Sequence, residues 1–369
     1  MSPYRQVISP STVLLPRAAL LEMVRVMRTL FRLGGLPAYR ELVRPLVPQA
    51  ARFDPGHDGI MMGYDFHLTD QGPRLIEVNT NAGGGLLAYQ AQSGRSGFSR
   101  SGRDRFRENF LASFYEELSH HGGRSRLARI AIIDEAPEEQ FLYQEMLAYA
   151  ELLRAEDLDA AVVEPGELQA DAEGVRLKGE PVDLIYNRHC DFYLESEAMA
   201  GIRAAYLAGK VCLTPNPFVY GLLADKRRMI LWSDPQALAA LGLSPRAVDL
   251  LQRTVPQSRL LAEVDAEQVW QDRKDLVFKP VTRFGSRGVL LGRKISRKRF
   301  NELPPDETLV QQLVPPSQMT PEGDTQEMKV DFRLFAYRNR LLGVAARLYQ
   351  GQVTNLRTPG GGYAPVRIV

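Results

Sequence analysis

Residues 127–214 alternate short apolar runs with segments of helical periodicity, and this alternation restricts the fold more than any other feature of the chain. Apolar runs at 127–134 and 160–163 surround a helical pattern at 138–153, and runs at 182–186 and 211–214 surround a second one at 197–208. A buried strand, a helix and another buried strand form a βαβ unit with parallel strands and a right-handed crossover. Residues 124–223 are therefore predicted to form a small doubly wound domain. This segment has no GxGxxG motif and so carries no dinucleotide fingerprint.

The composition is that of an ordinary water-soluble protein with room for two or three packed units. The 369 residues are 44% hydrophobic, and 46 basic against 44 acidic residues give a formal charge of +2, which favours neither nucleic acid nor membrane as a partner. No apolar run approaches the roughly 20 residues of a membrane span and no cleavable signal pattern is present, so the cytoplasm is the expected location. Cys190, Cys212 and five scattered histidines give neither a disulfide framework nor a zinc site.

Three oxygen-donor side chains stand at the ends of two strands that form a predicted β-hairpin. Polar and apolar positions alternate at 64–68 and 74–79, and the turn signal DQGP falls between them at 70–73. Residues two apart on a strand point to the same face, so Glu77 and Asn79 lie side by side and Asp65 on the partner strand can face them. Two carboxylates and an amide oxygen suit Mg²⁺. The alternative is a solvated hairpin whose polar face meets only water.

A second candidate site lies in the segment LVFKPVTRFGSRGVLL at 276–291. A predicted strand delivers Lys279, and a loop with Gly285, Ser286 and Gly288 leads to the next strand. Glycines let backbone N–H groups crowd an anion while the lysine adds a point charge, which suits nucleotide phosphates. The loop is not a Walker A motif, because GxxxxGK[ST] is absent. The alternative is a plain hairpin with a solvated lysine.

The remaining strands of this half also predict binding surfaces. The strand at 308–314 could line an adenine pocket through its backbone. The runs MKVDFRLFAY at 328–337 and LLGVAARL at 341–348 indicate a hairpin that places Arg333 and Arg347 on neighbouring strands. Asn355 follows, in a segment that ends in a glycine-rich loop.

The order of these motifs resembles that of the ATP-grasp superfamily. A KP pair with a glycine-rich loop, a QQLV strand, DFRLF with VAARL, and TNLRTPGGG follow one another as in that superfamily. In its usual members a strand with Asp and a strand reading (I/L)E(V/I)N close the series. Here that element stands far earlier, from Asp65 to Asn79, with Glu77 twelve residues after Asp65 as in the usual spacing. The chain therefore resembles circularly permuted members.

Among those members it is similar to the glutathionylspermidine synthase-like proteins. The segments VDLIYNRHCDFYL and DKR also resemble that group. It departs from those synthases at Gly63, where they carry arginine, and no fused amidase domain is seen in these residues. Neither glutathione nor spermidine is therefore indicated as a substrate.

The resemblance implies an α/β fold in four parts and a role for each candidate residue. The parts are N-terminal helices with the permuted metal-binding hairpin (1–123), the doubly wound, preATP-grasp-like domain (124–223), a nucleotide-lid subdomain (224–314), and a C-terminal subdomain that completes the core sheet with residues 62–85 (315–369). Asp65, Glu77 and Asn79 would bind one or two Mg²⁺ ions; Lys226 and Lys279 would contact the ATP phosphates, with Gly285, Ser286 and Gly288 closing over them; Gln311, Gln312 and Leu313 would hold adenine; and Arg333, Arg347 and Asn355 would act in catalysis.

The reaction that the resemblance implies is the ATP-dependent ligation of a carboxylate and an amine. The carboxylate takes the γ-phosphate to give an acyl phosphate, and the amine captures it with release of phosphate. Arg188, at a predicted strand end where ligands gather, and Asn81 are candidate contacts for the small-molecule or peptide substrates. Two alternatives are a kinase that leaves the phosphate on an alcohol and a non-catalytic nucleotide-binding protein. The sequence indicates neither the substrates' identity nor the oligomeric state.

Overall fold

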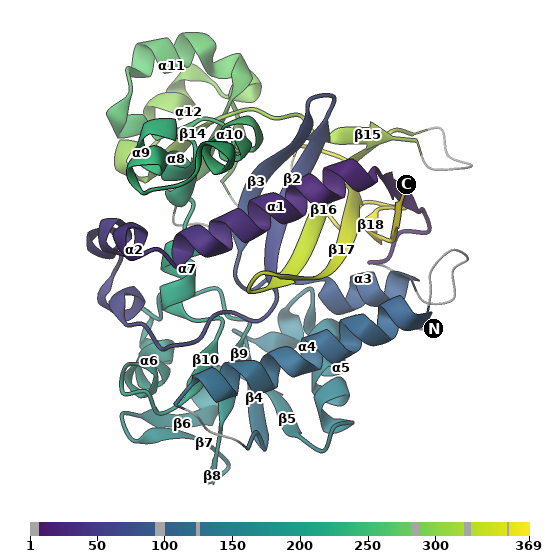
Figure 1. Ribbon diagram of the computed structural model, residues 1–369, viewed down its shortest axis with the longest axis vertical. Coiled ribbons are helices and arrows are strands. Elements are labelled where there is room, and N and C mark those ends of the chain that lie inside the picture. Colours follow the sequence, from purple (N-terminus) through teal and green to yellow (C-terminus); the bar gives the residue numbers. More distant parts are fainter. Residues whose placement is uncertain (1–6, 93–99, 123–125, 282–287, 321–325, 353) are drawn as a thin grey trace.

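The computed structural model describes residues 7–92, 100–122, 126–281, 288–320, 326–352 and 354–369. Three main sheets with surrounding helices lie at the bottom, middle and top of Figure 1, and two smaller sheets accompany them. Helix and strand are thus mixed as the α/β pattern predicts. None of the helices in these residue ranges is long and apolar enough to cross a membrane.

The central sheet joins the two hairpins that the sequence predicts. Its strands are β2 (Met62–Thr69), β3 (Gly72–Asn79), β15 (Ser317–Met319), β16 (Met328–Tyr337), β17 (Arg340–Tyr349) and β18 (Gly362–Ala364). They run in the order β18-β17-β16-β2-β3, with β15 also paired to β16, and all pairs are antiparallel. The β2–β16 pair places residues about 270 positions apart opposite each other, for example Asp65 and Arg333. Both hairpins therefore lie in one sheet, whereas the circular permutation itself stays a prediction.

Helices cover both faces of the central sheet, and successive residues of β16 point alternately to one face and the other. Phe332 and Leu334 point to the face that packs on α1 (Arg17–Gly34). Phe335 and Tyr337 point to the other face, in one core with α3 (Gly85–Gln92) and α4 (Arg100–His120). The first half of that second face carries charged residues instead of apolar ones, among them Arg333. This half of the sheet is where the site lies.

The predicted doubly wound segment forms the lower part of the molecule (Figure 1). A parallel sheet has the order β10-β9-β4-β5, with β4 (Arg129–Ile133), β5 (Asp159–Val163), β9 (Leu184–Asn187) and β10 (Cys212–Thr214). Helices α5 (Tyr143–Arg154) and α6 (Ala200–Leu207) connect these strands. A small antiparallel sheet of β6 (Leu168–Asp171), β7 (Gly174–Leu177) and β8 (Glu180–Pro181) is an addition that the βαβ pattern does not predict.

The upper part is an antiparallel sheet with short helices, which we call the lid (Figure 1). Its strands are β11 (Ser258–Leu260), β14 (Thr308–Gln312), β12 (Leu276–Pro280) and β13 (Leu290–Leu291), in that order. Its helices are α8 (Arg228–Trp232), α9 (Pro235–Ala240), α10 (Pro245–Thr254), α11 (Ala266–Asp272) and α12 (Arg297–Asn301). The strand pair predicted around the glycine-rich loop is thus β12 with β13.

The two ends of the chain lie beside each other. Strand β1 (Val13–Leu15) pairs in parallel with β19 (Val366–Ile368), and Ile8 forms a bridge with Tyr363. The remaining α-helices in the described ranges are α2 (Pro37–Val43) and α7 (Pro217–Leu223).

Candidate active site

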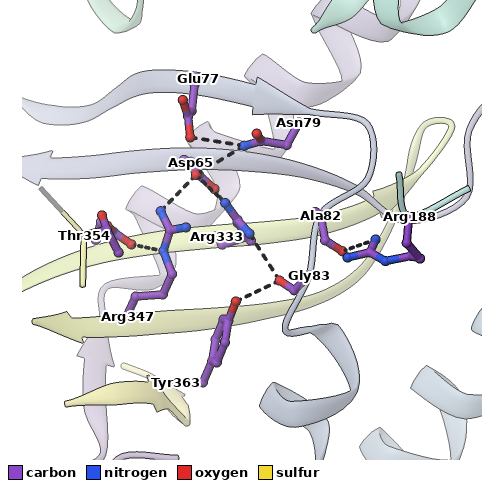
Figure 2. Close-up of polar contacts among 11 residues, drawn as sticks. Asp65, Glu77, Asn79, Ala82, Gly83, Arg188, Arg333, Arg347, Thr354 and Tyr363 are labelled. Atoms are coloured by element: carbon purple, nitrogen blue, oxygen red, sulfur yellow. Dashed lines mark hydrogen bonds and ion pairs between the residues drawn. The ribbon is translucent and has the colours of Figure 1, made fainter. Parts of the chain in front are cut away.

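The β2–β3 hairpin brings Asp65, Glu77 and Asn79 together, as the alternation predicts. Asp65 stands directly opposite Glu77, and a register shift after that pair leaves Ile76 as the extra residue of a β-bulge. The amide nitrogen of Asn79 lies 3.4 Å from an oxygen of Asp65 and 3.4 Å from an oxygen of Glu77 (Figure 2). Three oxygen-bearing groups therefore converge on one point of the sheet.

Two arginines from β16 and β17 hold the Asp65 carboxylate (Figure 2). Arg333 donates from Nε and Nη2 to its two oxygens at 2.6 and 2.7 Å, and Arg347 Nη2 donates at 2.9 Å. Burial alone raises the pKa of Asp65, but the two guanidinium groups lower it by more, so the pKa of this carboxyl lies well below its usual value. Asp65 is therefore a fixed anion, although it is only 2% exposed.

A second buried carboxylate, Asp331, belongs to this network and was not among the predicted site residues. Arg347 Nε donates to Asp331 Oδ1 at 2.5 Å, and Thr354 Oγ1 donates to Oδ2 at 2.8 Å. Asp331 stands two residues before Arg333 on β16, so the period-two rule that paired Glu77 with Asn79 could have found it.

Gly63 leaves space that the side chain of Arg333 fills. A Cβ atom on Gly63 would lie 2.5 Å from the Cβ of Ala82 and 3.3 Å from Arg333 Nε. A side chain on β2 at this position would therefore overlap Ala82 and press on the Arg333 guanidinium from β16. The positive charge beside Gly63 is therefore that of Arg333, from the neighbouring strand β16.

Lys279 reaches the hairpin from strand β12 of the lid. Its Nζ donates to Gln311 Oε1 at 2.7 Å and to the carbonyl oxygen of the bulge residue Ile76 at 3.1 Å. Burial lowers the pKa of Lys279 to about 8, with the charge of Glu77 opposing the shift and that of Lys226 adding to it. Lys226, Lys279 and Glu77 line one small cavity beside the hairpin. The two predicted phosphate-binding lysines therefore lie at the same point.

A pocket with about 840 Å³ of empty space, part of it open to solvent, separates the lid from the central sheet. The central sheet contributes Asp65, Glu77, Asp331 and Arg347, and the lid side contributes Lys279, Gln311, Gln312 and Leu313. Apolar and charged side chains line this pocket together, as they do in small-molecule sites. We call it the cleft pocket; it collects most of the predicted metal, phosphate and adenine residues around one space.

Four predicted residues lie away from the cleft pocket or outside the described residues. Gly285 and Ser286 lie outside the described residues, and Gly288 is exposed with φ +76° just before Val289, which lines the cleft pocket. Asn355 is exposed in a turn, where its Oδ1 accepts from the backbone N–H of Arg357 at 3.1 Å. Its neighbour Thr354, not Asn355, lines the cleft pocket.

The candidate substrate residues Arg188 and Asn81 meet on the other side of the hairpin, where the loop after β3 contacts the end of β9. Asn81 Nδ2 donates to the backbone carbonyl of Arg188 at 3.1 Å, and Arg188 Nη1 donates to that of Ala82 at 3.2 Å. The carbonyl of Gly83 accepts from Arg333 Nη1 at 3.2 Å and from Tyr363 OH at 2.9 Å (Figure 2). Arg333 therefore touches both the Asp65 carboxylate and this loop.

Glu145 fixes the same loop and was not predicted. It is buried and accepts from the backbone N–H groups of Gly84 at 2.7 Å and Leu86 at 3.0 Å. The sequence around Glu145 on α5 does not predict this contact, because the backbone groups of the loop that it binds are 58 or more residues away.

The sequence matches no protein-family model and no curated protein. Solved structures with the same fold exist. A glutathione synthetase-like effector of Globodera pallida superposes with a TM-score of 0.64 at 12% identity, over 98% of this chain and 90% of that one. A candidate gamma-glutamylcysteine synthetase of Methylobacillus flagellatus superposes with a TM-score of 0.55 at 10% identity, over 97% of this chain and 89% of that one. The chain therefore has the fold of an ATP-grasp protein, as the order of its motifs predicts.

Proposed function

We propose that this protein is an ATP- and Mg²⁺-dependent ligase of the cytoplasm that joins a carboxylate to an amine through an acyl phosphate. One observation carries the proposal. Asp65 and Glu77 of the β2–β3 hairpin, Arg347 of β17 and Lys279 of the lid line the cleft pocket together, and Arg333 of β16 holds the Asp65 carboxylate. Phosphoryl transfer needs positioning and charge stabilisation more than covalent work by the protein, and this set supplies both.

The lid side of the cleft pocket suits an adenine nucleotide. Val277, Val289 and Leu291 give it an apolar wall, and the chain at Gln312 and Leu313 passes along its edge. Lys279 stands at the end nearer Glu77, where the phosphates would lie. Because its pKa is about 8, Lys279 is mainly protonated at neutral pH and can pair with phosphate.

The residues Asp65, Glu77 and Asn79 fit an Mg²⁺ ion. The Asn79 amide nitrogen already stands between the two carboxylates, and a half-turn of the amide puts its oxygen there. No group of three His, Cys, Asp or Glu side chains in the described ranges is arranged to hold a metal, and the Asn79 amide would be the third donor beside the two carboxylates. Mg²⁺ bound here would bridge and neutralise phosphate oxygens, with waters and phosphates as its other ligands.

Arg333 and Arg347 would stabilise charge on the transferred phosphoryl group. Both are 7% exposed and are oriented by carboxylates, Arg333 by Asp65, and Arg347 by Asp65 and Asp331. A guanidinium held in place before the reaction needs little reorganisation as charge moves. The substrate carboxylate attacks the γ-phosphate, ADP leaves, and the amine then displaces phosphate from the acyl phosphate to form the amide.

The acceptor substrates would bind where the loop after β3 meets the parallel sheet. Arg188 lies at the carboxyl end of β9, the edge at which open α/β sheets hold ligands. Its guanidinium can bind a carboxylate, and Asn81 holds the backbone of that strand end. Arg333 contacts the same loop and so links this region to the cleft pocket.

Product trapping separates a ligase from a kinase. The protein is incubated with ATP, Mg²⁺ and a panel of amino acids, peptides and polyamines, and ADP and phosphate release are followed with and without hydroxylamine. A ligase releases phosphate only when a carboxylate and an amine are both present, and hydroxylamine in place of the amine gives a hydroxamate. A stable phosphate ester without hydroxamate would identify the kinase alternative. Nucleotide binding without turnover on any substrate would favour a non-catalytic protein.

A further inference from the structure

A second pocket, which we call the basic pocket, opens beside the cleft pocket and is lined by three cations. It has about 1180 Å³ of empty space, part of it open to solvent, and its wall includes Arg293, Lys294 and Lys329. Among the described residues, its lining contains no carboxylate. The site described above does not use this space.

The three cations reach the basic pocket from two different parts of the fold. Arg293 and Lys294 follow Gly292, whose Cβ position would lie 1.8 Å from the carbonyl oxygen of Arg273, so the chain here is packed directly against backbone. Lys329 stands at the start of β16 in the central sheet, and its Nζ donates to the carbonyl of Gly351. One arginine and two lysines from different elements therefore line the same pocket.

Nothing in the described part of the chain neutralises these charges, since none of the three residues has a carboxylate within ion-pair distance there. Burial lowers the pKa of Lys329, and the charges of Arg293 and Lys294 lower it further. Like charges held together without a counterion repel, and an anion in their midst would remove that repulsion.

The basic pocket joins the cleft pocket at its lid edge. Arg293, Lys329, Pro315 and Pro316 line both. Pro315 and Pro316 directly follow Gln312 to Val314, beyond the stretch proposed to hold adenine, whereas Lys279 and Glu77 lie toward the phosphate end. An anion in the basic pocket would thus sit near the nucleoside end of a bound nucleotide.

We propose that the basic pocket binds a phosphate group that lies beside the nucleotide and outside its triphosphate chain. This placement rests on the proposed function, although the cation cluster itself does not. The phosphate has two possible sources, the ribose of the nucleotide or a separate phosphorylated molecule. Its recognition is by charge-assisted hydrogen bonds from one guanidinium and two ammonium groups.

The test uses Lys294→Gln, because Lys294 lines the basic pocket and not the cleft pocket. Lys298→Gln is the matched control, since Lys298 is exposed on α12 and lines neither pocket. Calorimetric titrations at low ionic strength measure the affinity for ADP, for ADP with a 2′-phosphate, and for pyrophosphate in the presence of saturating ADP. Loss of one partly exposed cation is expected to weaken binding of the extra phosphate by about fivefold and to leave ADP affinity unchanged.

The source of the phosphate follows from which ligand responds. A 2′-phosphate that tightens ADP binding, with the gain lost in Lys294→Gln but kept in Lys298→Gln, places the group on the ribose. Pyrophosphate that binds together with ADP and shows the same difference between the variants indicates a separate molecule. If neither ligand distinguishes Lys294→Gln from Lys298→Gln, the proposal is overturned. Failure of ADP to bind, with pyrophosphate alone still sensitive to Lys294→Gln, would reject the nucleotide site and support the basic pocket.

Discussion

At the scale of single residues, the site is a set of opposite charges in which one carboxylate differs from the others. Asp65 and Asp331 are each held by arginine side chains. Glu77 is half-buried and, among the described residues, forms no ion pair. Lys279 faces it from the lid, but donates its hydrogen bonds to Gln311 and Ile76. Glu77 is therefore the carboxylate best able to take up a cation without breaking an existing pair.

Glu77→Gln keeps the size of this side chain and removes its charge. If the carboxylate holds Mg²⁺, turnover should fall by about a hundredfold or more and the Mg²⁺ concentration for half-maximal rate should rise. The melting temperature should stay close to that of the parent. Glu173→Gln, on the exposed turn between β6 and β7, is the control for loss of one negative charge. Normal activity with unchanged Mg²⁺ dependence would remove Glu77 from the site.

The pKa of Lys279, lowered by burial to about 8, gives a pH dependence whose sign is set. The lysine loses its charge as the pH rises through 8, so the affinity for ADP should fall between pH 7 and 9.5. The Lys279→Met variant should bind ADP weakly at every pH in this range and should not show that fall. Folding responds in the opposite direction. The unfolded chain keeps this lysine protonated up to its ordinary value of 10.5, so stability of the free protein should rise between pH 8 and 10.5. Calorimetry and denaturant titration across this range measure both effects.

At the scale of elements, the loop between β3 and α3 connects the charged half of the central sheet to the parallel sheet. Gly84 has φ +91°, and a Cβ on it would lie 1.9 Å from the ring of Tyr363. Glycine is needed there both for the backbone conformation and for the close approach of the ring. The run of glycines that the sequence shows after Asn81 is thus explained by packing, and the loop position is set by residues from three separate elements.

Gly63→Ala tests whether the fit between β2, this loop and Arg333 matters. The new methyl group would overlap Ala82 and press on Arg333, so the free energy of unfolding should fall by about 1–3 kcal/mol. The catalytic rate should fall as well, because Arg333 is displaced from Asp65. Gly343→Ala, on β17 of the same sheet, is the control, since its Cβ would meet Phe106 at an ordinary 3.4 Å. Equal effects of the two substitutions on rate would argue against a special role for Gly63.

Arg188→Ala tests the acceptor side of the site. If the guanidinium binds the substrate carboxylate, KM for that substrate should rise about tenfold or more, with ADP affinity nearly unchanged. Arg176→Ala, at an exposed position of strand β7, controls for the loss of an arginine. A collapse of ADP affinity would instead assign Arg188 to the nucleotide site or to folding.

At the scale of the whole molecule, the sequence predicts what depends on local periodicity and motif order. Asp65, Glu77 and Asn79 meet as a two-residue period and a turn signal require, and motif order anticipates that their hairpin joins the strand of Arg333. Contacts between distant elements carry no such signal. Glu145 with Gly84, and Tyr363 with Gly83, join segments whose own patterns indicate only a core helix and a short strand. The exposed position of Asn355 likewise follows from a turn after Thr354 that the motif does not specify.

The adjacency of the chain ends allows the chain order to be changed. A variant that begins at Arg126, ends at Gly122 and joins Val369 to Met1 through about 15 Gly and Ser residues should fold and bind ADP with nearly normal affinity. Ile8 pairs with Tyr363 and Val13 with Val366, so the two ends that the linker joins belong to segments that lie side by side. Circular dichroism and calorimetry measure the result. An insoluble or nucleotide-free product would show that this chain order is required for assembly.

The pairing of β2 with β16 also determines when the site can exist during synthesis. About 260 residues separate the end of β2 at Thr69 from the start of β16 at Met328. At about 5 to 20 residues per second, the hairpin with Asp65 leaves the ribosome roughly 13 to 50 seconds before the strand that carries Arg333. During that interval the edge of β2 has no partner strand and Asp65 has neither of its arginines. A nascent chain can therefore complete the lower parallel sheet first, and Asp65 acquires its arginines only after β16 and β17 have emerged.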